Sequence, residues 1–335
     1  MYCNSCLKQI PVSEVTYCKE CGVPLHKSCS NHCLECGADM CNDCYAENRF
    51  RCSDCITENK TLRTVRRSYL KQYEDCPYSL YLQLIEGITP PMSSYAELGI
   101  IVHELIEKMQ NNQIDAYGAK VELLNRVEEW NISTEDEYSV IPLNLLNVGN
   151  KCIDVFATML LPMLNDDFKT EYKIEFSLRE NLPTVNCTLD RISFVNGDIH
   201  IHDWKTGKPM AGKQLVTDLQ PPVYIYGVYQ EFGILPKTFT LHYLNAEKNI
   251  TYQHTEGMIY TVKTARRSYT LDVEAAMERV AQILENIQKN KFAIIEDKEH
   301  LWRCEKMCWF HSSGVCEDSI TTVWRRQTEE YEKAS

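Results

Sequence analysis

Paired cysteines at the start of the chain constrain its fold more than any other feature. Eleven of the seventeen cysteines lie in the first 55 residues, and together with one histidine they form six pairs of ligands spaced three positions apart. The pairs are Cys3 and Cys6, Cys18 and Cys21, His26 and Cys29, Cys33 and Cys36, Cys41 and Cys44, and Cys52 and Cys55. Because a structural zinc ion takes four such ligands, the pattern predicts about three zinc ions in residues 1–58. A segment so poor in core residues needs such ions to fold.

The spacing predicts zinc but leaves the pairing of ligands open. Cys18-x2-Cys21-x4-His26-x2-Cys29 resembles the middle of RING and PHD fingers. An interleaved arrangement, with Cys3, Cys6, His26 and Cys29 on one ion, is therefore favoured over sequential pairing, and His32 is a spare ligand. The segment holds five basic and eight acidic residues, which favours a protein partner over DNA. A purely structural role is the third alternative.

The bulk composition limits the remaining possibilities. With 335 residues, 44% of them hydrophobic, the chain is long enough for one sizeable core beside the small cysteine-rich module. No stretch approaches the run of about 18 apolar residues that spans a membrane, and the N-terminus lacks the pattern of a secretory signal. We therefore expect a cytoplasmic protein without a membrane partner.

Charge is distributed unevenly along the chain. The net charge of −12 disfavours nucleic acid as a partner, because phosphate groups are neutralised by Lys and Arg. Between Asn59 and Tyr73, however, there are five basic residues and no acidic one, and a smaller basic cluster lies at Lys263, Arg266 and Arg267. Solvated surface is the alternative interpretation of each cluster taken alone.

The periodicity of apolar residues predicts an α/β core with a mixed sheet. Helices are expected over 95–110, 116–130, 142–163, 219–231 and 271–290. Strands are expected over 173–178, 186–195, 199–205, 237–244 and 258–263. Asn196-Gly197-Asp198 is a turn signal that joins 186–195 and 199–205 in a hairpin.

This hairpin carries polar residues typical of a hydrolytic metal site. Asp203 and Lys205 lie two positions apart on one strand and therefore point to the same face, and the hairpin can bring Asp190 beside them. Two carboxylates on neighbouring strands suit Mg²⁺ or Mn²⁺, and a nearby lysine can orient a water molecule and offset developing negative charge. A solvated Asp-x-Lys on a surface hairpin is the alternative.

Further motifs, in order along the chain, distinguish these interpretations. They are Gly99-x3-His103-x2-Ile106-Glu107, Leu189-Asp190-Arg191-Ile192, Asp203-Trp204-Lys205-Thr206-Gly207 and Gln220-x3-Tyr224. The ordered set resembles the RecB-type PD-(D/E)XK nuclease domain, which also occurs in AddB and in CRISPR-associated iron–sulfur exonucleases. Ser193 stands where that family often has an acidic residue. The resemblance covers about residues 65–320 and implies a restriction-endonuclease-like mixed sheet with flanking helices.

The resemblance also implies roles for individual residues. His103, Asp190 and Asp203 would hold the metal with the backbone carbonyl of Trp204, and Lys205 would be catalytic. Gln220 and Tyr224 would position the lysine or the DNA backbone.

The six cysteines after the zinc module separate into two groups. Cys152 and Cys187 stand alone in the sequence, and a lone cysteine is usually a small buried hydrophobic residue. Cys76 lies in Tyr73-x2-Cys76-Pro77, which resembles the opening of the iron–sulfur nucleases, and Cys304, Cys308 and Cys316 lie near the C-terminus. The family arrangement of one N-terminal and three C-terminal ligands implies a [4Fe–4S] cluster. The looser spacing here leaves zinc as the alternative metal.

Together these inferences predict the organisation and activity of the chain. Residues 1–58 would form the zinc module, 59–75 a basic linker and helix, 76–320 the nuclease domain and 321–335 a charged tail. The expected activity is metal-dependent hydrolysis of DNA, with exonuclease action on single-stranded or unwound ends favoured by the resemblance, in recombination, repair or processing of foreign DNA. The alternatives are a structure-specific or nicking endonuclease, a non-catalytic DNA-binding scaffold, and a RING-type ubiquitin ligase.

Overall fold

In the computed structural model the chain divides into two compact units. The first contains residues 1–90, 177–185 and 280–335, and the second contains residues 91–176 and 186–279. The structure describes residues 2–3, 9, 11, 15–19, 21–26, 30–33, 38–41, 62–134, 136–164, 166–289, 291–292 and 298–316.

A mixed sheet forms the centre of the fold and confirms the expected α/β class. Its order is β12-β11-β10-β9-β8-β7-β5, and β6 also pairs with β7. β8 and β9 are parallel, whereas the pairs β7–β8, β9–β10, β10–β11 and β11–β12 are antiparallel. The strands are β6 (Asp167–Phe176), β7 (Thr184–Val195), β8 (Asp198–Lys205), β9 (Thr238–Tyr243), β10 (Lys248–Glu256), β11 (Ile259–Lys263) and β12 (Ser268–Asp272).

The hairpin of β7 and β8 lies within one residue or two of the expected strands. Asn196 and Gly197 both have positive φ angles, of 52° and 88°. A tight two-residue turn requires this conformation, and Asn-Gly adopts it readily. The resulting register places Arg191 opposite His202 and Ile192 opposite Ile201, so Asp190 comes next to the end of β8.

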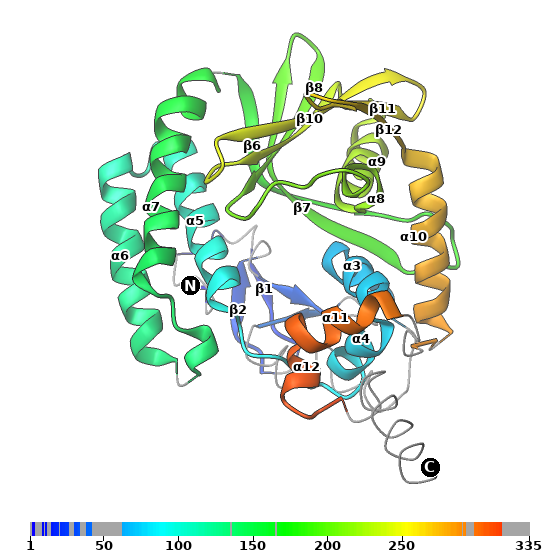
Figure 1. Ribbon diagram of the computed structural model, residues 1–335, viewed down its shortest axis with the longest axis horizontal. Helices are drawn as coiled ribbons and strands as arrows, with labels where there is room; N and C mark the ends of the chain where they lie inside the picture. The colour runs from blue at the N-terminus through cyan, green and yellow to red at the C-terminus, as the bar shows by residue number, and fades with distance from the viewer. Residues whose placement is uncertain are drawn as a thin grey trace, which may run out of the picture. The chain divides into compact units, whose positions relative to one another are not determined.

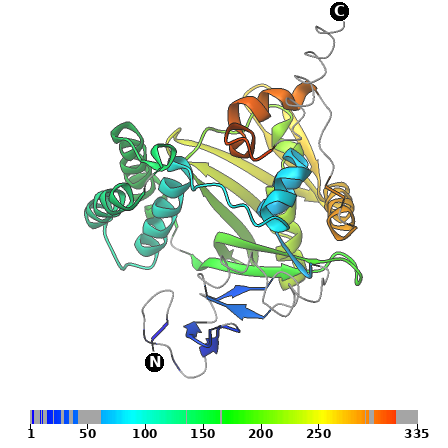
Figure 2. The same ribbon diagram turned by 90° about the horizontal axis from the view of Figure 1, so that it is seen from below.

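Three helices of the second unit pack side by side as a layer (Figures 1 and 2). They are α5 (Ser94–Gln110), α6 (Ala116–Ser133) and α7 (Leu143–Val155). Gly149 allows α7 to approach closely, because a Cβ atom there would lie 2.9 Å from the side chains of Leu98 and Leu123. The layer encloses an apolar cluster that also includes Trp204 of β8.

Two expectations for the second unit were wrong in detail. The helix expected over 142–163 is α-helical only to Val155 and continues as a π-helical turn, Phe156–Leu160, and a 3-10 turn, Leu161–Met163. Pro162, which has no N–H to donate, explains why regular α-helix does not persist. β10 and β12 were not expected, because few of their residues are apolar; β10 buries only Ile250 and Tyr252.

One more helix of the second unit is α9 (Gln220–Phe232). Pro221 and Pro222 lie in its first turn, and Gly233, whose φ is 68°, follows its last residue. Proline in the first turn and a left-handed glycine after the last are the usual signals of helix ends. The helix packs on β6, and Gly227 makes room for Phe176, whose ring would lie 3.1 Å from a Cβ atom there. α9 thereby brings its first residue toward the polar end of β8.

The first unit contains short helices and small strands. The helices are α3 (Arg67–Asp75), α4 (Pro77–Leu84), α11 (Lys298–Met307) and α12 (Trp309–Ser312). The strands are β1 (Val15–Tyr17), β2 (Pro24–His26), β3 (Asn31–His32), β4 (Asp39–Met40) and β5 (Thr64–Arg66). β5 meets the start of β7, where the N–H of Thr184 donates to the carbonyl of Arg63 at 2.7 Å. α10 (Val273–Gln288) begins in the second unit and ends in the first.

Candidate active site

Asp190 connects the three elements of the site: α5, β7 and β8. Its Oδ2 accepts a hydrogen bond from the backbone N–H of Trp204 at 2.6 Å, and His103 Nδ1 of α5 lies 3.4 Å from the same oxygen. The Asp190 side chain is 11% exposed and that of His103 is 28% exposed, so solvent reaches the pair only in part. The structure thus places His103, Asp190 and the Trp204 backbone together, as the motifs suggested.

Asp203 lies beside them and is held from two sides. Lys205 Nζ is 2.7 Å from Oδ2, and Gln220 Nε2 of α9 donates a hydrogen bond to Oδ1 at 2.6 Å. The side chain of Asp203 is only 2% exposed. Among the described residues, the Lys205 ammonium is the positive group next to Oδ2.

The pKa values of the two carboxylates shift in opposite directions. Burial raises the pKa of Asp203, and the negative charge of Asp190 adds to this, while Lys205 opposes it. Burial also acts on Asp190, but the positive charge and hydrogen bond of His103 outweigh it and hold the pKa of Asp190 below its ordinary value. Burial would lower the pKa of His103, but Asp190 raises it to about 9. Closely spaced groups with such divergent environments are typical of functional sites.

The donor atoms suit a divalent cation by their chemistry, although those of His103, Asp190 and Asp203 do not all lie within 4.8 Å of one another. Two nearly buried carboxylates, one imidazole and a strand carbonyl offer mostly hard oxygen ligands, which suit Mg²⁺ or Mn²⁺. Asp203 Oδ2 is nearly buried and has the Lys205 ammonium beside it, and a carboxylate oxygen so placed keeps a lone pair that such a cation would accept.

Glu171 is a member of this region that the sequence did not indicate. It lies on β6 with a positive φ of 47°. Its side chain reaches solvent, yet desolvation by the surrounding protein, followed by the negative charges of Asp190 and Glu107, raises its pKa to about 7. Glu107, one turn after His103 on α5, accepts from the Thr170 hydroxyl at 3.5 Å. Only the position of β6 in the sheet relates Glu171 to the hairpin, so no sequence motif reveals it.

Arg191 supports the site from the opposite face of β7. It is fully buried and donates to Ser193 Oγ at 2.9 Å and to Gln110 Oε1 at 3.0 Å, and it forms an ion pair with Asp166. Gln110 ends α5, the helix that carries His103, so this network joins the helix to the strand of Asp190. Ser193, which departs from the family pattern, is itself buried and takes part in the network.

Two other histidines near the site belong to its packing. His202 and His242 lie beside Trp204, with 3.0 Å between His202 Nδ1 and His242 Nε2, and His242 Nδ1 is 3.0 Å from Asn249 Oδ1. Burial lowers their pKa values to about 3 and about 4, so both are neutral at pH 7. Tyr224 lies one turn after Gln220 on α9, is buried, and packs edge-on against Phe239.

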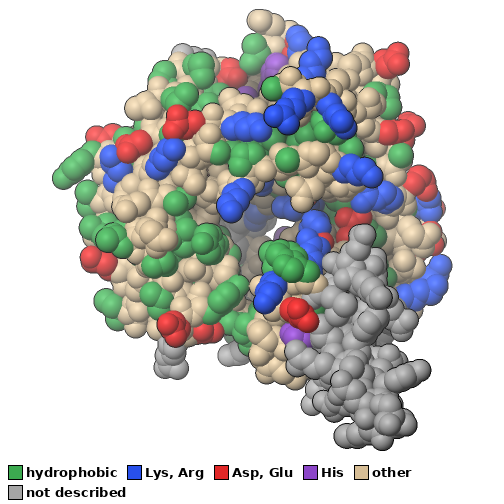
Figure 3. Space-filling view, in the orientation of Figure 1, with side chains coloured by type: hydrophobic (Ala, Val, Ile, Leu, Met, Phe, Trp, Pro, Cys, Tyr) green, Lys and Arg blue, Asp and Glu red, His purple; other side chains and the backbone are tan. Residues whose placement is uncertain are grey.

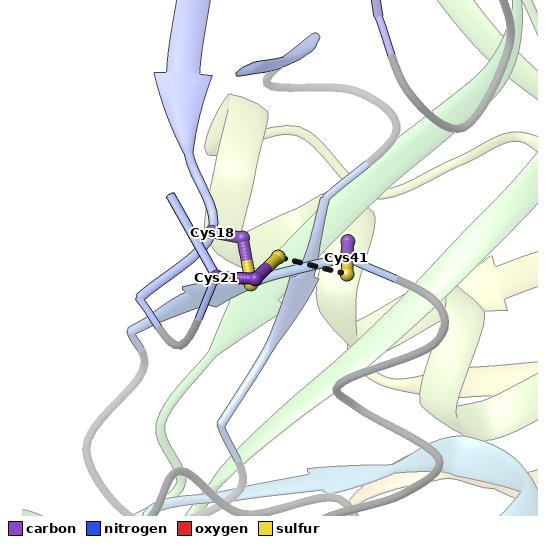
Figure 4. A group of neighbouring side chains, drawn as sticks. All are labelled: Cys18, Cys21 and Cys41. Carbon is purple, nitrogen blue, oxygen red and sulfur yellow. Dashed lines mark hydrogen bonds between the residues drawn. The ribbon is translucent and has the colours of Figure 1, made fainter. Parts of the chain in front are cut away.

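A thiol cluster occupies the N-terminal segment (Figure 4). Cys18, Cys21 and Cys41 place their sulfur atoms within 4.8 Å of one another, with 3.7 Å between Cys21 and Cys41. Within the residues that can be described, no other trio of Cys, His, Asp or Glu side chains is so close. The cluster brings the second ligand pair, Cys18 and Cys21, next to Cys41 of the fifth ligand pair. Cys3 and Cys33 are buried in the same small core.

Several predicted zinc ligands lie outside the described residues. These are Cys6, Cys29, Cys36, Cys44, Cys52 and Cys55, and the side chain of His26.

The predicted iron–sulfur cysteines lie in or beside short helices of the first unit. Cys76 separates α3 from α4, Cys304 is on α11, and Cys308 precedes α12. An ion pair between Asp75 and Arg303 joins the residues beside Cys76 and Cys304. Burial, followed by the proximity of Cys76 and Cys308, raises the pKa of Cys304 to about 11. Cys316 ends this segment, with its N–H donating to the Phe310 carbonyl at 2.8 Å.

No helix in the described ranges combines the length and apolar character needed to cross a membrane.

Comparison with solved structures finds distant neighbours. A protein from Eubacterium rectale described as a candidate exonuclease is 11% identical, with a TM-score of 0.41 over 69% of this chain and 83% of its own. Protein SSO0001 is 16% identical, with a TM-score of 0.31 over 64% of this chain and 95% of its own. Protein VC1899 from Vibrio cholerae is 14% identical, with a TM-score of 0.21 over 60% of this chain and 51% of its own.

Curated proteins give no match to the chain. A family model, in contrast, matches residues 67–316, which include the whole constellation around Asp190 and Asp203. The chain belongs to the PD-(D/E)XK nuclease superfamily.

Proposed function

We propose that this nuclease hydrolyses DNA with a divalent cation held by His103, Asp190, Asp203 and the carbonyl of Trp204. The observation that carries the proposal is the convergence of Asp190 and Asp203 beside Lys205, with 2.7 Å between Lys205 Nζ and Asp203 Oδ2. Mg²⁺ or Mn²⁺ bound there would lower the pKa of a water molecule and neutralise the scissile phosphate.

The protein side chains then orient the reacting groups. Lys205, anchored by Asp203, presents a positive charge toward the phosphate and can orient the attacking water. Gln220 fixes Asp203 through its Oδ1, and Asp190 fixes the backbone of Trp204. Tyr224 supports this end of α9 by its packing on Phe239. Such preorganised charges are worth more in a site from which water is largely excluded.

The resemblance to RecB-type domains supports exonuclease action on single-stranded or unwound DNA ends, in recombination, repair or processing of foreign DNA. A gel assay tests this with end-labelled linear DNA, single- and double-stranded, beside closed circular DNA of the same sequence, with Mg²⁺ or Mn²⁺. We expect short products from the linear substrates and none from the circles. Nicking of circular DNA would contradict the exonuclease and support the endonuclease alternative.

We also propose the domain organisation that the motifs suggested: a zinc module at 1–58, a linker and helix at 59–75, a nuclease domain at 76–320 and a charged tail at 321–335. The zinc module would bind a protein partner or stabilise the fold. Cys76, Cys304, Cys308 and Cys316 would hold a [4Fe–4S] cluster in a structural role, because hydrolysis transfers no electrons.

For the zinc module we expect about three zinc ions per chain, by elemental analysis of the intact protein. We propose that one ion joins Cys18, Cys21 and Cys41, with Cys44 as fourth ligand because it completes the C-x2-C pair of Cys41. Cys21→Ser and Cys41→Ser should each lose one zinc ion, and the double variant should lose no second one. A double variant that lacks two ions would assign the two cysteines to different sites.

A further inference from the structure

Two arginines are held at the tip of the β11–β12 hairpin. The Thr264 hydroxyl accepts from the backbone N–H groups of Arg266 and Arg267 at 3.4 and 3.1 Å and donates to the carbonyl of Arg267 at 2.9 Å. The N–H of Thr264 also donates to that carbonyl, at 2.8 Å. The turn is therefore fixed by its own hydrogen bonds, while both arginine side chains are exposed.

The strand register places this turn at the same edge of the sheet as Lys205, by which we mean the side where β8 and β9 end. β8 and β9 run parallel with Lys205 opposite Tyr243, and β10 runs back from Lys248, which is also opposite Tyr243. β11 then runs toward that edge again and ends at Lys263, opposite Ser268 of β12. Four strand intervals separate β8 from β12, so the turn lies roughly 15–20 Å from Lys205 at about 4.8 Å per interval.

The segment that follows Lys205 spans part of this distance. It includes α8 (Gln214–Thr217), which packs against β12 and is tied to β10 by the hydroxyl of Tyr252, which donates to the Leu215 carbonyl at 2.7 Å. Lys208 and Lys213 are exposed on this segment. Basic side chains therefore continue from the active site toward the β11–β12 turn.

These exposed cations form one group, which we call the basic edge. None forms an ion pair with a carboxylate of a described residue, whereas Lys237 at the other edge of the sheet pairs with Asp198. Figure 3 shows Lys and Arg side chains gathered over the part of the molecule where Figure 1 draws β10, β11 and β12. The basic edge consists of Lys208, Lys213, Lys248, Lys263, Arg266 and Arg267. Unpaired cations at one edge of a chain with net charge −12 indicate an anionic partner.

We propose that Arg266 and Arg267 form a phosphate-binding subsite for the strand whose phosphodiester is cleaved beside Lys205. This rests on the proposed DNA nuclease function. Arginine binds phosphate oxygens through two parallel N–H donors, which suits a fixed turn. At about 3.4 Å per nucleotide in a helical strand, the subsite holds the backbone about five nucleotides from the scissile phosphate.

The test is binding of labelled single-stranded oligonucleotides, about 3 and about 12 nucleotides long, by fluorescence anisotropy in the absence of divalent metal. Arg266→Ala/Arg267→Ala should weaken binding of the long oligonucleotide about tenfold and lower its salt slope by about 1.4, at about 0.7 per phosphate contact. Binding of the short one should not change. Arg266→Lys/Arg267→Lys should retain most of the salt slope, and Lys237→Gln at the opposite edge is the matched control.

Cleavage by the same variants separates this subsite from the proposed function. If the double alanine variant binds the short and the long oligonucleotide as tightly as the wild type does, the subsite is overturned, even if the wild type cleaves DNA normally. Length-dependent binding that requires the arginines, without cleavage of any DNA, would uphold the subsite and overturn the nuclease proposal. If Lys237→Gln weakens binding as much as the double alanine variant does, the effect comes from net charge alone, and the subsite is also overturned.

Discussion

Asp203→Asn is expected to reduce metal-dependent DNA cleavage about a thousandfold or more, because it removes a negative ligand of the ion that supplies the nucleophile and the charge compensation. The substitution preserves side-chain shape, and the amide can still meet Gln220, so the fold should persist. Initial rates with end-labelled DNA measure the effect, and circular dichroism melting checks the fold.

Neighbouring variants should give a graded series. Lys205→Ala should cost about 10²–10³-fold, as removal of one preorganised charge does. Gln220→Ala should cost about 10–100-fold, because Gln220 acts by orienting a ligand. The order of these effects, more than any single value, distinguishes a metal ligand from a residue that only stabilises the hairpin.

Asp198→Asn is the matched control. It removes the same charge from the same strand, β8, but at the turn end, where Asp198 pairs with Lys237 in partial solvent exposure. The free energy of unfolding of the Asp198→Asn protein should differ from that of the wild type by no more than about 0.5 kcal/mol, and its DNA cleavage should be nearly unchanged. Full activity of purified Asp203→Asn protein, or equal losses in Asp198→Asn and Asp203→Asn, would remove Asp203 from the active site.

Local sequence signals predicted the parts of the site that lie on one hairpin and its neighbouring helices. The turn at Asn196 and Gly197 fixes the register of β7 and β8, and the register brings Asp190 to Asp203. Gln220 was expected to position the lysine or the DNA backbone, and the structure shows it donating to Asp203 from the start of α9, which the two prolines mark. Each of these positions is determined by residues close to it in sequence.

Other features depend on tertiary pairing and had no such signal. β10 and β12 are mostly polar strands, so apolar alternation did not reveal them. Glu171 reaches the region of Asp190 only because β6 pairs with β7. The contact of Cys18 and Cys21 with Cys41 passes over two intervening ligand pairs, one of which is His26 with Cys29, and spacing alone cannot choose among such combinations.

The second large effect concerns the cysteines at the ends of the nuclease segment. Anaerobically purified protein should be brown, with about four iron atoms per chain, and Cys76→Ser should bleach it. Cys76 separates α3 from α4, and the Asp75–Arg303 ion pair joins residues 228 positions apart beside two of the proposed ligands. Cys187→Ala, which removes a buried cysteine outside the proposed ligand set, is the control and should retain the colour.

Loss of the proposed cluster should also destabilise the fold, because the cluster would link α3 to α11 across most of the chain. By the loop-closure estimate used for cross-links of this length, such a link would stabilise the folded state by about 5 kcal/mol. Removing it should lower the melting temperature by about 10 °C or more for a domain of this size. The surface ion pair of Asp75 and Arg303 alone contributes at most about 1 kcal/mol, so it cannot replace the link. Colourless anaerobic protein with four zinc ions and no iron would show that the same four thiols hold zinc, while a Cys76→Ser protein that keeps its iron would remove Cys76 from the ligand set.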